Sequence, residues 1–163
     1  MPSIIADIAL VATPIVIAVG FYFAYGQWVS TRKARMAKLV ILITSHWDST
    51  EMAESRRTVN ECGSNLKKVW EDADKANEIE SYSSLIRVAN FFDALGVQVG
   101  EGFLDISIAY DLFGKAEKTY YRLYDPLINA REYEDYVPYF RRLHELFIKE
   151  EARRSHVKQR RAS

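Results

Sequence analysis

One stretch of the 163-residue chain is the best guide to its architecture: Ser81-Tyr-Ser-Ser-Leu-Ile-Arg-Val-Ala-Asn-Phe-Phe-Asp-Ala-Leu-Gly96. Its apolar side chains recur at the spacing i, i+3, i+4, i+7 and i+10, which places them on one face of an α-helix. The pattern therefore predicts an amphipathic helix with one buried stripe. The residues of that stripe are Leu85, Val88, Ala89, Phe92 and Leu95.

Three glycines follow within seven residues, at Gly96, Gly100 and Gly102. A phosphate-binding loop needs a strand before its glycines and a Lys-Ser/Thr pair after them. Here a helix precedes the glycines, no such pair follows in register, and Glu101 would repel an anion. We therefore interpret Gly96 as the residue just past a helix end, where a positive φ costs glycine little.

Helical spacing also marks the last third of the chain. We expect one short helix that ends at Gly114, another that bends or restarts near Pro126, and a last helix with Pro138 in its first turn. No convincing alternating strand pattern occurs, so the fold is predicted to be all-α. The inward-facing residues of the last helix are expected to be Phe140, Leu143 and Phe147, with Leu146 as a further candidate.

Upstream of the central helix, the sequence predicts one helix restart and one connection. Residues 39–43 are expected to continue the first helix, and a new helix runs to about residue 62. Asp48 can accept from the free amides of its first turn while Glu51 reaches back, which is a capping-box arrangement. The acid-rich residues 71–77 look like a solvated connection.

The N-terminal region resembles a membrane anchor. It carries no charge from Ile8 to Thr31, and its apolar part, roughly residues 4–24, would extend about 30 Å as a helix, the thickness of a bilayer's hydrocarbon core. Aromatic rings and then cations follow, an order typical of a membrane–water interface on the cytoplasmic side. The expected interface residues are Phe21, Tyr22, Tyr25, Trp28, Arg32, Lys33, Arg35 and Lys38.

These patterns predict an N-terminal transmembrane helix followed by a small cytoplasmic helical bundle. The expected location is a bacterial inner membrane, crossed once, with the N-terminus outside. A cleaved signal peptide is one alternative, although Met1-Pro2-Ser3 lacks the basic residue that such a peptide needs. A buried helix of a soluble protein is the other. The expected parts are an anchor at 1–30, a basic juxtamembrane helix at 31–45, a helical domain at 46–150 and a basic tail at 151–163.

Charge and cysteine usage exclude several classes of function. The formal net charge is zero, but many of the cations lie in clusters at 32–38 and 153–161, which leaves an acidic body between them. An acidic body would be repelled by phosphate backbones, so we expect no nucleic-acid partner. The single cysteine excludes an internal disulfide, and three isolated histidines lack zinc-ligand spacing. We therefore expect neither a metal nor a cofactor.

Several motifs occur in a distinctive order over roughly residues 45–148. They are Trp47-Asp48-Ser49 with Arg56-Arg57 downstream, Arg87-Val-Ala-Asn-Phe-Phe-Asp-Ala-Leu-Gly96, Tyr110-Asp-Leu-Phe-Gly114 and residues 121–126. In this order the chain resembles an uncharacterised bacterial family, a domain of unknown function whose members are short helical proteins, often preceded by one membrane helix. The resemblance implies a helical fold and assigns no catalytic residue.

Polar residues beside the buried stripe form the candidate polar site. Arg87, Asn90 and Asp93 lie at i, i+3 and i+6, where they could join Asp48 or Arg56 in a network between helices. Interhelical ion pairs and helix caps use the same residue types as ligand sites. We therefore interpret these residues first as a structural network and second as a ligand site.

Two other features stay open. Cys62 is expected to be an inert small side chain rather than a reactive thiol. Tyrosines gather in the C-terminal third, where they either pack against other helices or line a protein interface. These tyrosines are Tyr120, Tyr121, Tyr124, Tyr133, Tyr136 and Tyr139.

Together these observations predict a membrane-anchored, non-enzymatic interaction or scaffold protein, acting as an accessory subunit of a larger inner-membrane complex. Its expected partners are the lipid bilayer and other membrane protein subunits. The alternative is a membrane-tethered sensor or regulator that binds a small ligand of unknown chemistry among its helices. An enzyme is least favoured, since the sequence offers no clear nucleophile with a base, carboxylate pair or metal box.

Overall fold

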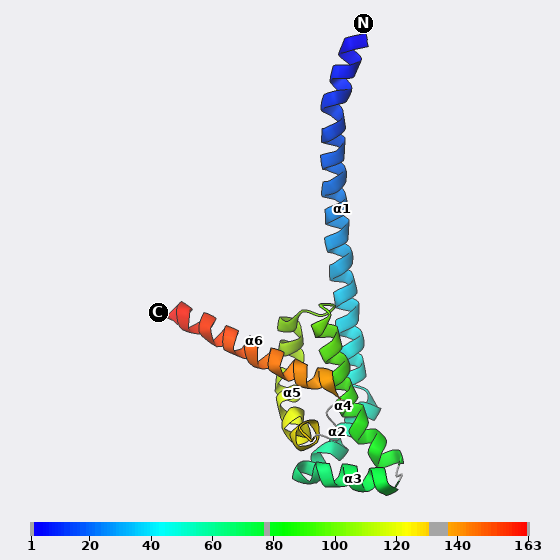
Figure 1. The fold of residues 1–163 in the computed structure, drawn as a ribbon, viewed down its shortest axis with the longest axis vertical. Coiled ribbons are helices and arrows are strands. Elements are labelled where there is room, and N and C mark those ends of the chain that lie inside the picture. Colours follow the sequence, from blue (N-terminus) through cyan, green and yellow to red (C-terminus); the bar gives the residue numbers. More distant parts are fainter. Residues whose placement is uncertain (1, 77–78, 131–136, 163) are drawn as a thin grey trace. The chain divides into compact units, whose positions relative to one another are not determined.

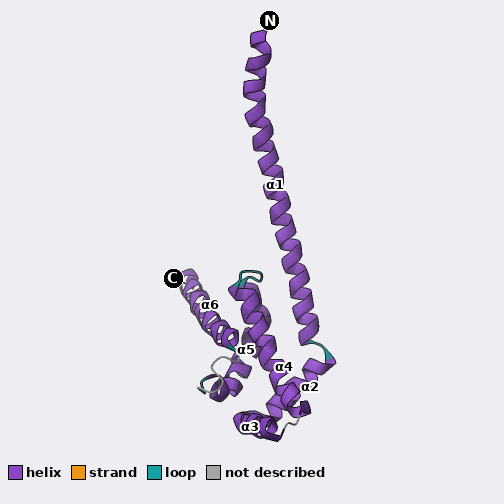
Figure 2. Ribbon diagram, turned by 45° about the vertical axis from the view of Figure 1, so that its right-hand side comes forward, coloured by secondary structure: helices purple, strands orange, loops and turns teal. Residues whose placement is uncertain are grey.

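The computed structural model describes residues 2–76, 79–130 and 137–162, with side chains described for 20–75, 83–130 and 137–160. Every regular element in these ranges is a helix, so the predicted all-α fold is confirmed (Figure 2). The chain divides into two compact units, residues 1–41 and 42–163, which are described separately below.

The first unit consists of most of α1 (Pro2–Trp47), one continuous helix of 46 residues. Within the described ranges, no helix combines the length and the apolar character needed to cross a membrane, so the predicted transmembrane helix is wrong. From Gly20 on, four basic residues between positions 32 and 38 interrupt the apolar sequence of α1. The side chains of residues 1–19, on which much of the predicted span falls, lie outside the described residues.

The second unit begins with the end of α1 and then α2 (Thr50–Cys62). The predicted restart is confirmed, but its cap is Ser49 rather than Asp48. The Ser49 Oγ accepts a hydrogen bond from the Met52 amide at 3.2 Å, whereas Asp48 lies exposed in the preceding turn. The predicted capping box with Asp48 is therefore wrong by one position.

A short 3₁₀ turn, η1 (Gly63–Asn65), leads into α3 (Leu66–Ala76). The prediction of a solvated connection is wrong up to residue 76, and residues 77–78 lie outside the described residues. Leu66, Trp70 and Ala73 are buried at helical spacing while acidic residues occupy the other face. One apolar face is enough to hold this acid-rich helix on the domain.

The predicted stripe is the buried face of α4 (Ile79–Gly100), because all five of its residues are at most 2% exposed. The helix nevertheless continues past Gly96, so the predicted helix end there is wrong. Gly96 is buried, and a Cβ at this position would overlap the backbone carbonyl of Tyr139. The positive φ of this region belongs to Gly102, at 72°, in the following turn.

Two further long helices complete the unit, α5 (Ile106–Ile128) and α6 (Pro138–Ala162). The predicted helix end at Gly114 and the predicted restart near Pro126 are wrong, because α5 runs through both. Pro126 lies in the last turn, where its missing N–H removes one hydrogen bond near a helix end. Pro138 opens α6 as predicted. The predicted inward-facing residues Phe140, Leu143 and Phe147 are buried, and Leu146 is half-buried.

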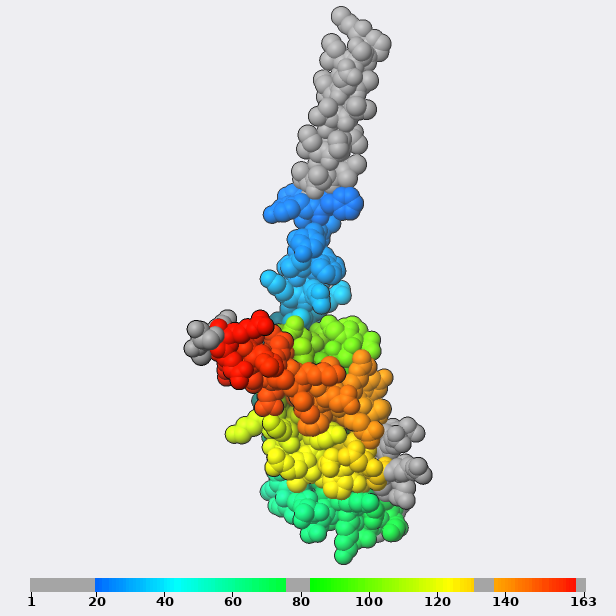
Figure 3. Space-filling view, turned by 60° about the vertical axis from the view of Figure 1, so that its left-hand side comes forward, coloured from blue at the N-terminus to red at the C-terminus, as the bar shows by residue number. Residues whose placement is uncertain are grey.

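The core of the second unit lies between these helices. α4 packs on α2 and α6, while α5 packs on α6, α3 and α4. Figure 1 shows α6 crossing α4 and α5, with its C-terminal end (red) extending past them. In Figure 3, α5 (yellow) lies between α6 (orange and red) and α3 (cyan-green).

An aromatic cluster joins the end of α1 to this core. The Trp47 ring contacts the rings of Phe91, Phe92, Phe113 and Tyr120, with centroids 4.7, 5.5, 5.7 and 5.9 Å apart. Aromatic pairs at such distances contribute packing beyond their buried area. Trp47 thereby fixes the last turn of α1 to α4 and α5.

Candidate functional site

The first unit carries a stripe of rings and cations along α1. Phe21, Tyr25, Trp28, Arg32 and Arg35 follow one another at alternating spacings of four and three, which keeps them on one helix face. The three rings are 73%, 66% and 57% exposed. Tyr25 and Trp28 lie 6.1 Å apart by ring centroid, and the Arg32 guanidinium carbon lies 5.7 Å from the Trp28 centroid. We call these five residues the aromatic-basic stripe.

The remaining predicted interface residues flank this stripe. Tyr22 is 77% exposed and packs edge-on against Phe23, with ring centroids 6.1 Å apart. Lys33 and Lys38 are exposed on neighbouring faces of the helix. The rings and cations are thus accessible within this unit, and their assignment to a membrane interface stays a prediction.

The residues of the candidate polar site make separate contacts. The Arg87 guanidinium of α4 donates to the Ser55 hydroxyl at 3.1 Å and to the Glu51 carbonyl at 3.4 Å, which ties α4 to α2. Arg56 instead lies over the Trp47 ring, with its guanidinium carbon 4.3 Å from the ring centroid. Such a cation–π contact adds an attraction between α2 and the last turn of α1.

Asp93, the third of these residues, caps the N-terminus of α6. Its Oδ1 accepts hydrogen bonds from the backbone amides of Tyr139 at 2.8 Å and Phe140 at 3.0 Å. Burial raises the pKa of this carboxyl group, and the two amides act in the opposite direction. Asp48 and Asn90 are exposed. Arg87, Arg56 and Asp93 therefore serve different helix contacts, and the described contacts do not join the five residues in one network.

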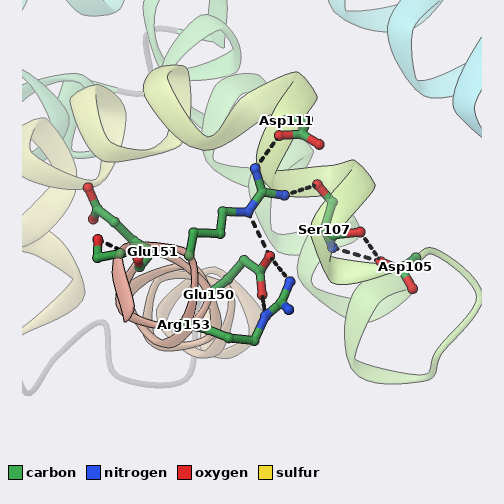
Figure 4. A network of polar contacts seen from close by, with 8 residues as sticks. Asp105, Ser107, Asp111, Glu150, Glu151 and Arg153 are labelled. Carbon is green, nitrogen blue, oxygen red and sulfur yellow. Dashed lines mark hydrogen bonds and ion pairs between the residues drawn. The ribbon is translucent and has the colours of Figure 1, made fainter. Parts of the chain in front are cut away.

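An ionic network that the sequence did not predict joins the C-terminal half of α6 to the start of α5 (Figure 4). The buried Glu150 carboxylate accepts from Arg153 Nε at 2.7 Å and from Arg154 Nε at 2.7 Å. Arg154 also pairs with the Asp111 carboxylate and donates to the Ser107 carbonyl at 3.0 Å. Hydrogen bonds from Arg153, and to a smaller extent from Arg154, lower the pKa of Glu150 to about 2.

Comparison with known proteins gives the family. The model of a domain of unknown function, DUF4760, matches residues 3–149. The chain belongs to this family. No curated protein and no solved structure matches it significantly. The match confirms membership of an uncharacterised domain family, and it shows neither bacterial origin nor membrane anchoring.

The DUF4760 range includes the whole aromatic-basic stripe as well as α2 to α5. It ends just before Glu150, so the carboxylate at the centre of the ionic network lies beyond the matched residues. The arginines of that network come from the segment predicted as a basic tail, and they belong to α6.

The C-terminal tyrosines of this DUF4760 protein differ in burial. Tyr120 and Tyr124 are buried, and the Tyr124 hydroxyl donates to the Leu85 carbonyl at 2.6 Å. Tyr121 is half-buried and Tyr139 is exposed, whereas Tyr133 and Tyr136 lie outside the described residues. Core packing thus accounts for the first two.

The lone cysteine of the chain is half-buried at the end of α2. Burial is the larger cause that raises the pKa of the Cys62 thiol, and the nearby Glu61 acts in the same direction. A raised pKa keeps the sulfur protonated, which favours the inert interpretation.

Proposed function

We propose that this DUF4760 protein is a non-enzymatic interaction protein that docks on an anionic membrane surface through α1 and acts there as a scaffold. The observation that carries the proposal is the aromatic-basic stripe. The helical unit 42–163 is then the part that other protein subunits contact. The proposal requires no crossing of the membrane.

Exposed rings support the lipid partner. Large apolar side chains gathered on one surface typically mark an interaction site. Tyr25 and Trp28 have an apolar body with a polar tip, and such rings favour the headgroup region of a bilayer. Phe21 adds an apolar ring one turn earlier on the same face.

The cations favour an anionic surface over a neutral one. Arg32, Lys33, Arg35 and Lys38 lie within seven residues, and all four are exposed. A Lys or Arg close to an anionic leaflet contributes about 1 kcal/mol each, and this attraction is screened by salt. Arg32 stacks on Trp28, so docking of the ring brings a cation to the headgroups at the same time.

Contacts in the second unit favour the scaffold over the ligand-binding alternative. Arg87, Arg56 and Asp93 bind protein groups on α2, on Trp47 and at the start of α6. Polar side chains whose contacts are already made within the protein hold its helices together. A small-ligand sensor would need such residues to face a ligand instead.

Vesicle flotation of the full chain tests the lipid proposal. The wild-type protein is expected to bind vesicles that contain phosphatidylglycerol more tightly than vesicles of phosphatidylcholine alone, and the binding should weaken as salt increases. Replacing Arg32, Lys33, Arg35 and Lys38 by Gln should weaken binding to the anionic vesicles by more than about tenfold, because four headgroup attractions are lost.

A matched control removes four exposed cations from the second unit, with the substitutions K115Q, R122Q, K149Q and K158Q. It changes the net charge by the same amount and should leave vesicle binding close to that of the wild type. If both variants bind equally, or if the wild type ignores the lipid charge, the proposed docking is wrong.

A further inference from the structure

A buried acid and a histidine meet where α6 packs on α5. Glu117 of α5 is 1% exposed, and its Oε1 lies 2.9 Å from Nδ1 of His144 on α6. The Tyr121 ring stacks on the imidazole, with centroids 3.6 Å apart and planes 7° apart. The histidine therefore cannot turn away from the carboxyl group without breaking the stack.

The contact needs a proton between the two atoms, since neither a carboxylate oxygen nor a bare imidazole nitrogen can donate. Burial raises the pKa of Glu117 to about 8 and lowers that of His144. The preferred state at neutral pH thus has a neutral carboxyl group whose O–H donates to a neutral imidazole.

We infer that Glu117 and His144 form a proton-sharing pair that makes the packing of α6 on α5 sensitive to pH and weakens it in alkaline solution. When the shared proton leaves, a carboxylate remains almost fully buried with one histidine as its partner. A buried carboxylate without a directly paired cation is unfavourable, and the nearby Lys118 pairs with Glu151 instead. Separation of the two helices would hydrate it.

The charged surroundings of the pair come from both helices. On α5, the Lys118 ammonium opposes the raised pKa of Glu117, and Asp125 raises the pKa of His144. On α6, Glu145 raises the pKa of His144, and Arg141 acts on Tyr121.

The other helices that pack on α5 or α6 also carry charges, and none of their described contacts joins one of these charges to Glu117 or His144. On α4, Arg87 binds Ser55 and Asp93 caps α6. On α3, Lys67 pairs with Glu71, their side-chain atoms 3.7 Å apart. Described contacts thus leave Glu117 with His144 as its hydrogen-bond partner and Lys118 as its nearby cation.

The sign of the pH effect follows from proton counts. At neutral pH the folded pair holds one proton, whereas in the unfolded chain Glu117 is ionised and His144 is mostly neutral. Folding therefore takes up a proton between the unfolded histidine pKa of 6.5 and the folded Glu117 pKa of about 8. Stability from this pair is lost as pH rises through that window, and below it the proton counts of the two states converge.

Urea unfolding of the full chain across this window tests the inference. In the wild type, the pair should raise the unfolding constant by up to about tenfold per pH unit. Glu117→Gln keeps the shape and removes the titration, so its unfolding constant should depend much less on pH. Glu150→Gln is the matched control: it also replaces a buried glutamate, but one whose pKa is low, so the alkaline slope should persist.

A second measurement covers the case in which Glu117→Gln does not fold. The ¹³C resonance of the Glu117 carboxyl group in the wild-type protein should titrate with a midpoint near 8. Amides of α6 should lose protection across the same range relative to amides of α2. An acidic midpoint, or equal slopes in wild type and Glu117→Gln, would overturn the inference.

Discussion

Gly96 leaves room for the start of α6 on the surface of α4. A Cβ there would overlap the Tyr139 carbonyl, a backbone group that cannot turn aside. The sequence indicated a helix end at this glycine, because a contact with a residue 43 positions later leaves no local signal. The same holds for Glu117 and Glu150, whose burial depends on His144, Arg153 and Arg154 and not on neighbouring hydrophobicity.

Replacing Gly96 by alanine is therefore expected to destabilise the second unit by about 1–3 kcal/mol, the usual cost of overpacking. The measurement is the urea midpoint followed by circular dichroism. Gly100→Ala on the same helix is the control, because its Cβ would meet the Arg142 side chain at an ordinary 3.6 Å. Equal effects of the two substitutions would contradict the close approach at Gly96.

Helices were largely predictable as elements, because apolar spacing is clear in most of their sequences. The buried stripe of α4, the restart at α2 and the start of α6 at Pro138 were all found. The ends of the helices and the breaks within them were harder to predict from the sequence. Gly114 and Pro126 read as breaks, but packing along one face carries α5 through both. The acid-rich α3 was missed because its apolar face is narrow.

The N-terminal cap of α2 provides a direct test of one helix boundary. Ser49→Ala should cost about 1 kcal/mol of stability, since it removes the acceptor of the Met52 amide. Asp48→Ala should change stability by less than about 0.5 kcal/mol, as expected for an exposed side chain away from special contacts. Thermal or urea unfolding of both variants decides the matter. A larger effect at Asp48 would restore the original capping box.

For the whole molecule, the sequence pattern predicted an all-helical protein of an uncharacterised domain family, but it did not predict the character of the first unit. A long apolar run was interpreted as a membrane-spanning helix, whereas the described part of α1 mixes exposed rings with cations. The residues proposed for docking are the ones that the sequence indicated. The sequence alone does not specify the molecule or surface that these docking residues bind.

The docking of α1 on lipid can be measured at one position. In a Cys62→Ser background, a spin label at Ala24→Cys lies exposed near the stripe and leaves its rings intact. With anionic vesicles, its collisions with oxygen should increase and those with a water-soluble nickel complex should decrease, while a label at Lys115→Cys stays unchanged. An Ala24→Cys label that reports the same accessibility with and without anionic vesicles would contradict the account.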